Sequence, residues 1–183
     1  MKKMMAALMC AAVVLAMAGC GEKEPAQVPA SSGSAQGSVQ IPNPIVEEES
    51  LDKAAEKLGF SITLPEGFEA SAVRTINGEL LDVTAAKEEL NLSVRKAKGS
   101  EDVSGDYNQY AEEKQVLLSE GDSIVLEEAD SASTVTENEK MVTLKGAEGK
   151  MSLAVWTDGE FAYAVHCDGM DWEALCDLVN QIQ

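Results

Sequence analysis

The residue types that most often carry chemistry are scarce in this sequence. It has one histidine, four cysteines and 14 lysines and arginines, against 32 aspartates and glutamates. A chain with a net charge of −18 is repelled by phosphate backbones, so we expect no nucleic-acid partner. Anionic lipid headgroups repel it for the same reason, so charge alone would not hold it at a membrane. The acid excess is typical of a solvated surface that keeps a protein soluble, and an acidic patch for a cation or a basic partner is the alternative.

Sequence signatures of catalysis are missing as well. There is no glycine-rich phosphate loop, no histidine–cysteine zinc spacing and no serine elbow. With 32 acids some pair will always lie close, so a carboxylate pair is no specific sign of a glycosidase. His166 precedes Cys167, but neighbouring strand residues point to opposite faces, so His166 cannot activate that thiol. A pairing of His166 with Cys176 stays open, without a family signature around either residue. We expect no catalytic residue, no metal and no cofactor.

Long hydrophobic runs are limited to one, from Met4 to Ala18. This run has about 15 residues, whereas a membrane-spanning helix needs roughly 20. It follows Lys2 and Lys3 and ends in small residues, which is the pattern of a secretory signal peptide.

Ala18, Gly19 and Cys20 at the end of this run resemble a bacterial lipobox, with Met17 in place of the usual leucine. The resemblance implies that residues 1–19 are a lipoprotein signal peptide and that Cys20 becomes the first residue of the mature protein. Cys20 would carry diacylglycerol and palmitate and hold the protein at the extracytoplasmic face of the cell membrane. An uncleaved anchor and plain secretion after cleavage are the alternatives.

Residues 20–43 have the composition of a flexible linker between this anchor and a folded domain. Glu, Pro, Ala, Gln, Ser and Gly dominate, and such a segment cannot bury enough apolar surface to offset its ordering entropy. Pro42 and Pro44 bracket Asn43 and mark the domain edge. We expect one domain over residues 44–183, long enough to bury a core.

A short helix over residues 51–58 is predicted to open the domain. Its apolar residues recur at i, i+3, i+4 and i+7, and Ser50 is a good N-cap. Gly59 suits the left-handed position that ends a helix. A second helix is predicted after Asp171, with one apolar face up to Ile182.

Between the two helices, apolar residues recur with period two, which is typical of half-buried strands. Asn77-Gly78 and Asp158-Gly159 are strong hairpin signals, and residues 131–138 are interpreted as a loop. The pattern predicts the α+β class, a mostly antiparallel sheet with helices near the start and at the C-terminus of the domain covering one face. The predicted strands are 60–64, 68–76, 80–86, 90–95, 115–118, 123–127, 141–145, 150–156 and 161–167.

The loop 100–110 carries alternating oxygen donors, which hard cations such as calcium prefer. Its glycine, Gly105, does not stand at the sixth position that a calcium-binding loop requires. We expect instead a polar turn whose side chains cap their own backbone. The donors are Asp102, Ser104, Asp106 and Asn108.

Two cysteines remain in the domain, Cys167 and Cys176, and disulfides persist in exported proteins. Cys167 falls on the predicted buried face of its strand, and Cys176 falls on the buried face of the final helix. A short reversal over residues 168–170 brings strand end and helix together, so we predict a disulfide between the two. Two buried free cysteines are the alternative.

Three stretches of the domain resemble uncharacterised Gram-positive surface lipoproteins. They are the opening from Asn43 to Gly67, the loop residues 104–107, and residues 156–159 together with Tyr163. Similar domains of unknown function occur on anti-sigma-type membrane proteins and look distantly like the sheets of periplasmic lipoprotein carriers. These motifs are turns and core aromatics, so the resemblance implies no catalytic residues.

The sequence thus predicts a membrane-anchored extracytoplasmic lipoprotein with a non-catalytic binding or sensing domain. Its partners would be the membrane, through the lipid on Cys20, and an unknown protein or cell-wall component. A surface hydrolase with an acidic pair and a carrier of an apolar ligand are the alternatives. A cleft with two carboxylates roughly 5–10 Å apart would favour the hydrolase. A large apolar pocket would favour the carrier, and a closed core would favour binding.

Overall fold

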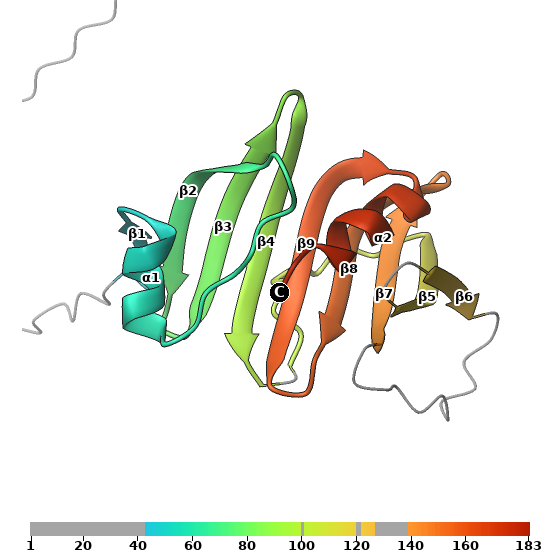
Figure 1. The fold of residues 1–183 in the computed structure, drawn as a ribbon. Helices are drawn as coiled ribbons and strands as arrows, with labels where there is room; N and C mark the ends of the chain where they lie inside the picture. Colours follow the sequence, from blue (N-terminus) through green and yellow to red (C-terminus); the bar gives the residue numbers. More distant parts are fainter. Residues whose placement is uncertain (1–42, 100, 120–121, 127–138) are drawn as a thin grey trace, which may run out of the picture. The chain divides into compact units, whose positions relative to one another are not determined.

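The computed structural model describes residues 43–99, 101–119, 122–126 and 139–183. These residues form one antiparallel sheet of nine strands with two helices (Figure 1). The helices are α1 (Leu51–Leu58) and α2 (Trp172–Asn180). The strands are β1 (Ile45–Glu48), β2 (Glu69–Ile76), β3 (Leu80–Lys87), β4 (Leu90–Lys98), β5 (Glu112–Ser119), β6 (Asp122–Leu126), β7 (Glu139–Ala147), β8 (Lys150–Thr157) and β9 (Phe161–Met170).

Two runs of antiparallel strands meet in the middle of the sheet. The order is β1-β2-β3-β4-β9-β8-β7-β5-β6, so the join pairs β4 with β9, and Val94 lies opposite Val165. This confirms the mostly antiparallel sheet with one helix near the start of the domain and one at its C-terminus. The sheet dominates the α+β fold.

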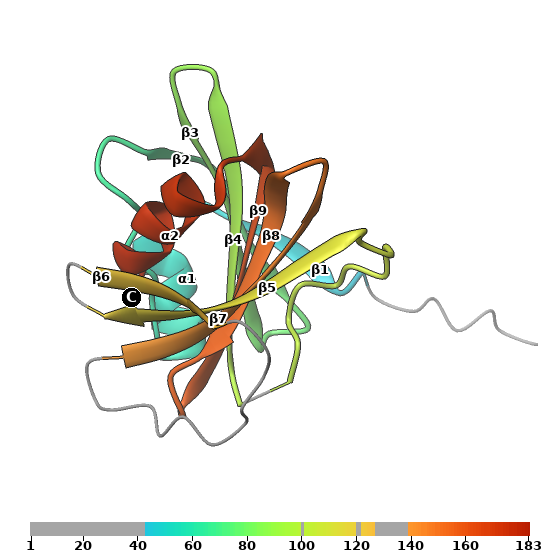
Figure 2. The same ribbon diagram turned by 90° about the vertical axis from the view of Figure 1, so that its right-hand side faces the viewer.

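Both helices cover the same face of the sheet (Figures 1 and 2). Helix α1 packs on β1, β2 and β3, and α2 packs on β5, β8 and β9. The core lies between the helices and this face, and its largest side chains include Leu81, Leu92, Leu144, Met151 and Leu175.

Local sequence signals set the ends of α1 as predicted. Ser50 Oγ accepts a hydrogen bond from the backbone N–H of Lys53 at 3.2 Å, which is an N-cap. Gly59 has φ +77° and its N–H donates to the carbonyl of Ala55, so the helix ends in the left-handed conformation that glycine allows. Asp171 is the N-cap of α2 but makes no side-chain capping hydrogen bond, and its carboxylate pairs with Lys150 at 2.8 Å.

Both predicted hairpin turns are confirmed. Asn77 and Gly78 have φ values of 55° and 71° between β2 and β3. Asp158 closes the turn between β8 and β9, where its Oδ1 accepts from the N–H groups of Glu160 and Phe161 at 3.0 and 2.7 Å.

Two segments differ from the sequence prediction. Residues 60–64 are not a strand; they pack on the core in the same layer as the helices and cross in front of the sheet (Figure 1). Their alternating apolar residues pack on the core without joining the sheet, and the Thr63 N–H donates to the carbonyl of Gln183 at 3.0 Å. Strand β1 was not predicted, because four residues after a proline carry too short a pattern. Residues 1–42 and 131–138, with the signal peptide, Cys20, the linker and a predicted loop, lie outside the described residues.

Candidate functional site

Asp82 is the centre of a polar cluster on the sheet face opposite the helices, which we call the open face. Strand register sets Asp82 beside Arg95, whose Nε donates to Asp82 Oδ1 at 3.2 Å. Ser93 Oγ donates to the same oxygen at 3.1 Å, and Arg74 Nη1 lies 3.8 Å from Oδ2. Asp82 is only 7% exposed, so removing one of these partners would leave a poorly compensated charge. The cluster therefore links β2, β3 and β4.

One carbonyl group holds the segment 101–111 against the open face. Ser104 O accepts hydrogen bonds from Arg95 Nη1 and, at 3.2 Å, from His166 Nε2. Gly105 has φ +63°, and a Cβ on it would lie 2.6 Å from Arg95 Nη1. The segment lies on the side of the sheet away from the helices (Figure 2). The positive φ therefore favours glycine at this position, and a side chain there would also displace the Arg95 guanidinium.

Beneath this segment the open face is apolar. Ala97, Leu153, Ala162 and Ala164 are buried, yet they are not part of the core on the helix side. Three of these four residues are alanines, whose small side chains leave room for the backbone near Ser104 to lie close to the sheet. Ser104 is buried against the sheet, whereas most other residues of the segment are exposed.

Asp106 fixes the far part of this segment. Its Oδ2 accepts a hydrogen bond from the Tyr110 hydroxyl, and its Oδ1 accepts from the N–H of Asn108 at 2.7 Å. Both hydrogen bonds lower the pKa of Asp106, and the bond from Tyr110 has the larger effect. Burial acts in the opposite direction, because it opposes ionisation. His166 Nδ1 lies 3.9 Å from Oδ2, so both ring nitrogens of His166 face the segment.

Three of the four oxygen donors of this loop, Asp102, Ser104 and Asp106, cap backbone groups, as predicted. Asp102 Oδ1 accepts from the N–H of Ser104 at 2.8 Å, and Ser104 Oγ accepts from the N–H of Asp106 at 3.2 Å. Each accepts from the N–H two residues further along the chain, so together they form successive turns. Among the described residues no group of three or more His, Cys, Asp or Glu side chains could hold a metal ion.

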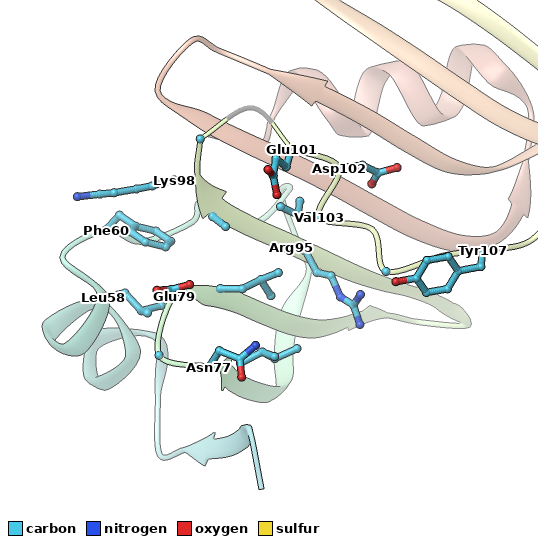
Figure 3. A pocket seen from close by; sticks show the side chains of 16 residues that line it. Leu58, Phe60, Asn77, Glu79, Arg95, Lys98, Glu101, Asp102, Val103 and Tyr107 are labelled. Atoms are coloured by element: carbon cyan, nitrogen blue, oxygen red, sulfur yellow. The ribbon is translucent and has the colours of Figure 1, made fainter. Parts of the chain in front are cut away.

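A groove of about 1040 Å³ lies where this segment meets the end of the sheet (Figure 3). It crosses the sheet end, from Leu58 and Phe60 after α1, past the β2–β3 turn, to the segment on the open face. Its charged and polar lining consists of Asn77, Glu79, Arg95, Lys98, Glu101 and Asp102.

Tyr107 stands at one side of this groove with its side chain in solvent. It is 97% exposed, whereas the chain's other described tyrosines, Tyr110 and Tyr163, are partly or fully buried. Figure 3 shows its ring on the side of the groove away from Phe60, with Arg95 between them. An aromatic ring that packs against nothing in its own fold is available to a partner.

A second cluster, missed in the sequence, lies on the helix side of the sheet. Trp156 and Tyr163 stack with ring centroids 4.9 Å apart and planes 1° from parallel. Lys140 Nζ lies 5.7 Å from the Trp156 ring, and Lys96 Nζ lies 5.0 Å from the Tyr163 ring. The stack is thus cation–aromatic–aromatic–cation across β7, β8, β9 and β4. These four residues come together through the strand order, which cannot be read from the sequence.

Asp158 is the acidic group that partly compensates the positive charges of the two lysines in this stack. Burial lowers the pKa of Lys96 and of Lys140, and Asp158 opposes that shift for both. Asp158 is itself partly desolvated, yet the hydrogen bond from the Tyr163 hydroxyl at 2.6 Å and its turn amides leave its pKa lowered. The arrangement stabilises the hairpin and the core; it offers no free reactive group.

Cys167 and Cys176 lie in the same apolar layer, as the disulfide prediction requires, but both are free thiols in the structure. Cys167 Sγ donates to the carbonyl of Met151 at 3.3 Å, and Cys176 is fully buried. Burial raises the pKa of Cys167, and it raises the pKa of Cys176 to about 11. Such thiols are poor nucleophiles at neutral pH.

The bridge stays a prediction for the protein in an oxidising compartment. Because both thiols face one layer, we expect protein from its native envelope to hold no maleimide-reactive thiol after denaturation without reductant. Reduction before labelling should expose two. Two reactive thiols in the unreduced sample would show that the cysteines stay free, as in the structure.

The separation of His166 from Cys167 is confirmed. Cys167 packs against the core, whereas His166 lies on the open face with Ser104 and Asp106 as neighbours. Cys176 is in the core too, so the structure brings neither of the described thiols to the histidine.

No family model, curated protein or solved structure matches this chain. The resemblance to Gram-positive surface lipoproteins therefore remains a prediction from its motifs. In the described part of the chain, neither helix is long and apolar enough to cross a membrane.

Proposed function

We propose that the protein is a membrane-anchored extracytoplasmic lipoprotein whose sheet domain binds a partner without catalysis. The anchor rests on Ala18, Gly19 and Cys20 after the apolar run. The binding role rests on the groove with Tyr107 at its side, since a 97% exposed aromatic beside a groove of about 1040 Å³ is suited to recognition.

Several of the described side chains that could react instead support the fold. His166 holds Ser104, Asp82 joins two arginines, and Asp158 closes a hairpin while binding Tyr163. Both described cysteines have a pKa raised by burial. A binding role requires none of these groups to be released.

A surface hydrolase is the second candidate, because Glu79, Glu101 and Asp102 all line the groove. Asp102 already caps the N–H of Ser104, which leaves Glu79 and Glu101 as the acidic pair. Hydrolysis of cell-wall polysaccharide by the wild type, lost in both Glu79→Gln and Glu101→Gln, would favour this candidate over binding alone.

Site-specific crosslinking in living cells tests the binding role. We expect a photo-reactive phenylalanine derivative at position 107 to form a discrete covalent adduct with a cell-surface component. The same group at position 89, an exposed residue on the β3–β4 turn at the other end of the sheet, serves as the control. Equal adducts from both positions, or none from 107, would contradict a binding role for the groove.

A further inference from the structure

Resting on the proposed function, we propose that the groove binds an extended cationic peptide segment of a partner protein, with a lysine or arginine side chain over the Tyr107 ring. The charge of the groove favours such a segment. Three acidic residues line the groove: Glu79, Glu101 and Asp102. The two basic lining residues are Lys98 and Arg95, and Arg95 is already paired with Asp82. The lining left to a ligand is therefore net negative.

The carboxylates at the groove are available. Glu79 and Glu101 are exposed and form no ion pair with the described residues, in contrast to Glu48, which lies 2.5 Å from Lys57. The chain as a whole carries a net charge of −18, so its field attracts a cationic segment from a distance. Charge complementarity of this kind raises association rates and favours basic partners over acidic ones.

The aromatic and apolar parts of the groove suit the rest of such a segment. An exposed tyrosine face attracts an ammonium or guanidinium group through the ring quadrupole. The protein uses the same interaction internally, where Lys96 lies 4.5 Å from the Phe161 ring. Leu58, Phe60 and Val103 provide apolar surface along the groove, against which the methylene stems of lysine side chains can pack.

The groove's shape also favours an extended chain. It runs across the end of the sheet, from the segment after α1 to residues 101–107 on the open face (Figure 3). A compact ligand would fill only part of this length. An extended peptide can place one side chain at Tyr107 and another near Glu79.

Fluorescence anisotropy with the full-length lipidated protein in detergent micelles tests this proposal. The probe is a labelled octapeptide of alternating glycine and lysine, compared with peptides that carry glutamine or glutamate in place of lysine. We expect the lysine peptide to bind at least tenfold more tightly than the glutamine peptide, and added salt to weaken it. Equal affinity for the lysine and glutamine peptides, or no binding of either, would overturn the proposal.

Matched variants locate the binding site. We expect Tyr107→Ala to weaken the lysine peptide about two- to fivefold, since a cation–aromatic contact at an exposed site is lost. Glu79→Gln with Glu101→Gln should weaken it further, whereas Glu88→Gln with Glu89→Gln, which removes the same charge at the other sheet end, should not. These four glutamates and Tyr107 are exposed, so the variants should fold. Equal loss in both double variants would overturn the groove as the site.

Two further outcomes separate this inference from the proposed function. Displacement of the lysine peptide by a neutral cell-wall oligosaccharide would contradict the peptide proposal and indicate that the groove binds a glycan. A crosslinked adduct at position 107 in cells, without any lysine-peptide binding in micelles, would overturn the cationic partner and leave the binding role intact.

Discussion

Replacing Gly146 by alanine is expected to destabilise the protein by about 3 kcal/mol, because a side chain there meets backbone that cannot move aside. A Cβ at this position would lie 1.9 Å from the carbonyl oxygen of Lys150 and 2.8 Å from Met151 Cα. Gly146 sits where the register between β7 and β8 shifts, so the irregular pairing itself creates the close approach. Denaturant unfolding followed by circular dichroism measures the loss.

Gly149→Ala is the matched control for this prediction. Gly149 lies in the turn that follows β7, with φ +76°, and a Cβ added to it would have no atom within 4 Å. Alanine there therefore meets conformational strain alone, which costs about 1 kcal/mol. If Gly146→Ala and Gly149→Ala unfold at the same denaturant concentration as each other, the close approach in the bulge is not real.

Trp156→Ala is expected to destabilise the protein by about 3–5 kcal/mol, the usual cost of removing a large core aromatic. Trp156 is 5% exposed, and its indole stacks on Tyr163 and lies under Lys140. Its removal leaves a cavity and also takes the aromatic face from a desolvated lysine. Chemical denaturation again provides the measurement.

Two variants separate the stack from mere bulk. Trp156→Phe keeps an aromatic face for Lys140 and should lose less than Trp156→Ala. Trp172→Ala, at the half-buried start of α2, should lose clearly less as well. If Trp172→Ala lowers the free energy of unfolding as much as Trp156→Ala does, the stack stabilises the core no more than any other large aromatic side chain.

Local chemistry made much of this fold predictable. Ser50 and Gly59 determine where α1 begins and ends through their own backbone neighbours. Asn77-Gly78 and Asp158-Gly159 determine two hairpins in the same way. Signals of this kind act within about four residues, so they are visible before any tertiary contact is known.

Arrangements that depend on strand order were not predictable. The pairing of β4 with β9 joins residues about 70 positions apart, and it alone brings Lys96 beside Tyr163 and Ser93 beside His166. The sequence of the polar loop 101–111 predicted its capping turns, but it did not predict that the loop lies over the open face. Residues 60–64 were wrongly predicted as a strand, because an alternating apolar pattern fits an unpaired segment in the helix layer as well as a strand.

The candidate site shows the same division. Tyr107 lies in the polar loop of residues 100–110, but no pattern in the sequence marks it as exposed or as part of a site. Its neighbours in the groove, Glu79 on the β2–β3 turn and Phe60 after α1, come from distant parts of the chain. Only the folded sheet end brings the three together.

Protease treatment of intact cells, followed by mass spectrometry of the washed membranes, tests the central claim of a lipid-anchored external domain most directly. Cleavage after Lys23 should release the domain and leave the peptide Cys20-Gly21-Glu22-Lys23 in the membrane, carrying diacylglycerol. Cells producing Cys20→Ala should lack this lipopeptide. A membrane peptide that still contains the apolar run from Met4 to Ala18, or a domain that resists protease until the cells are broken, would contradict the account.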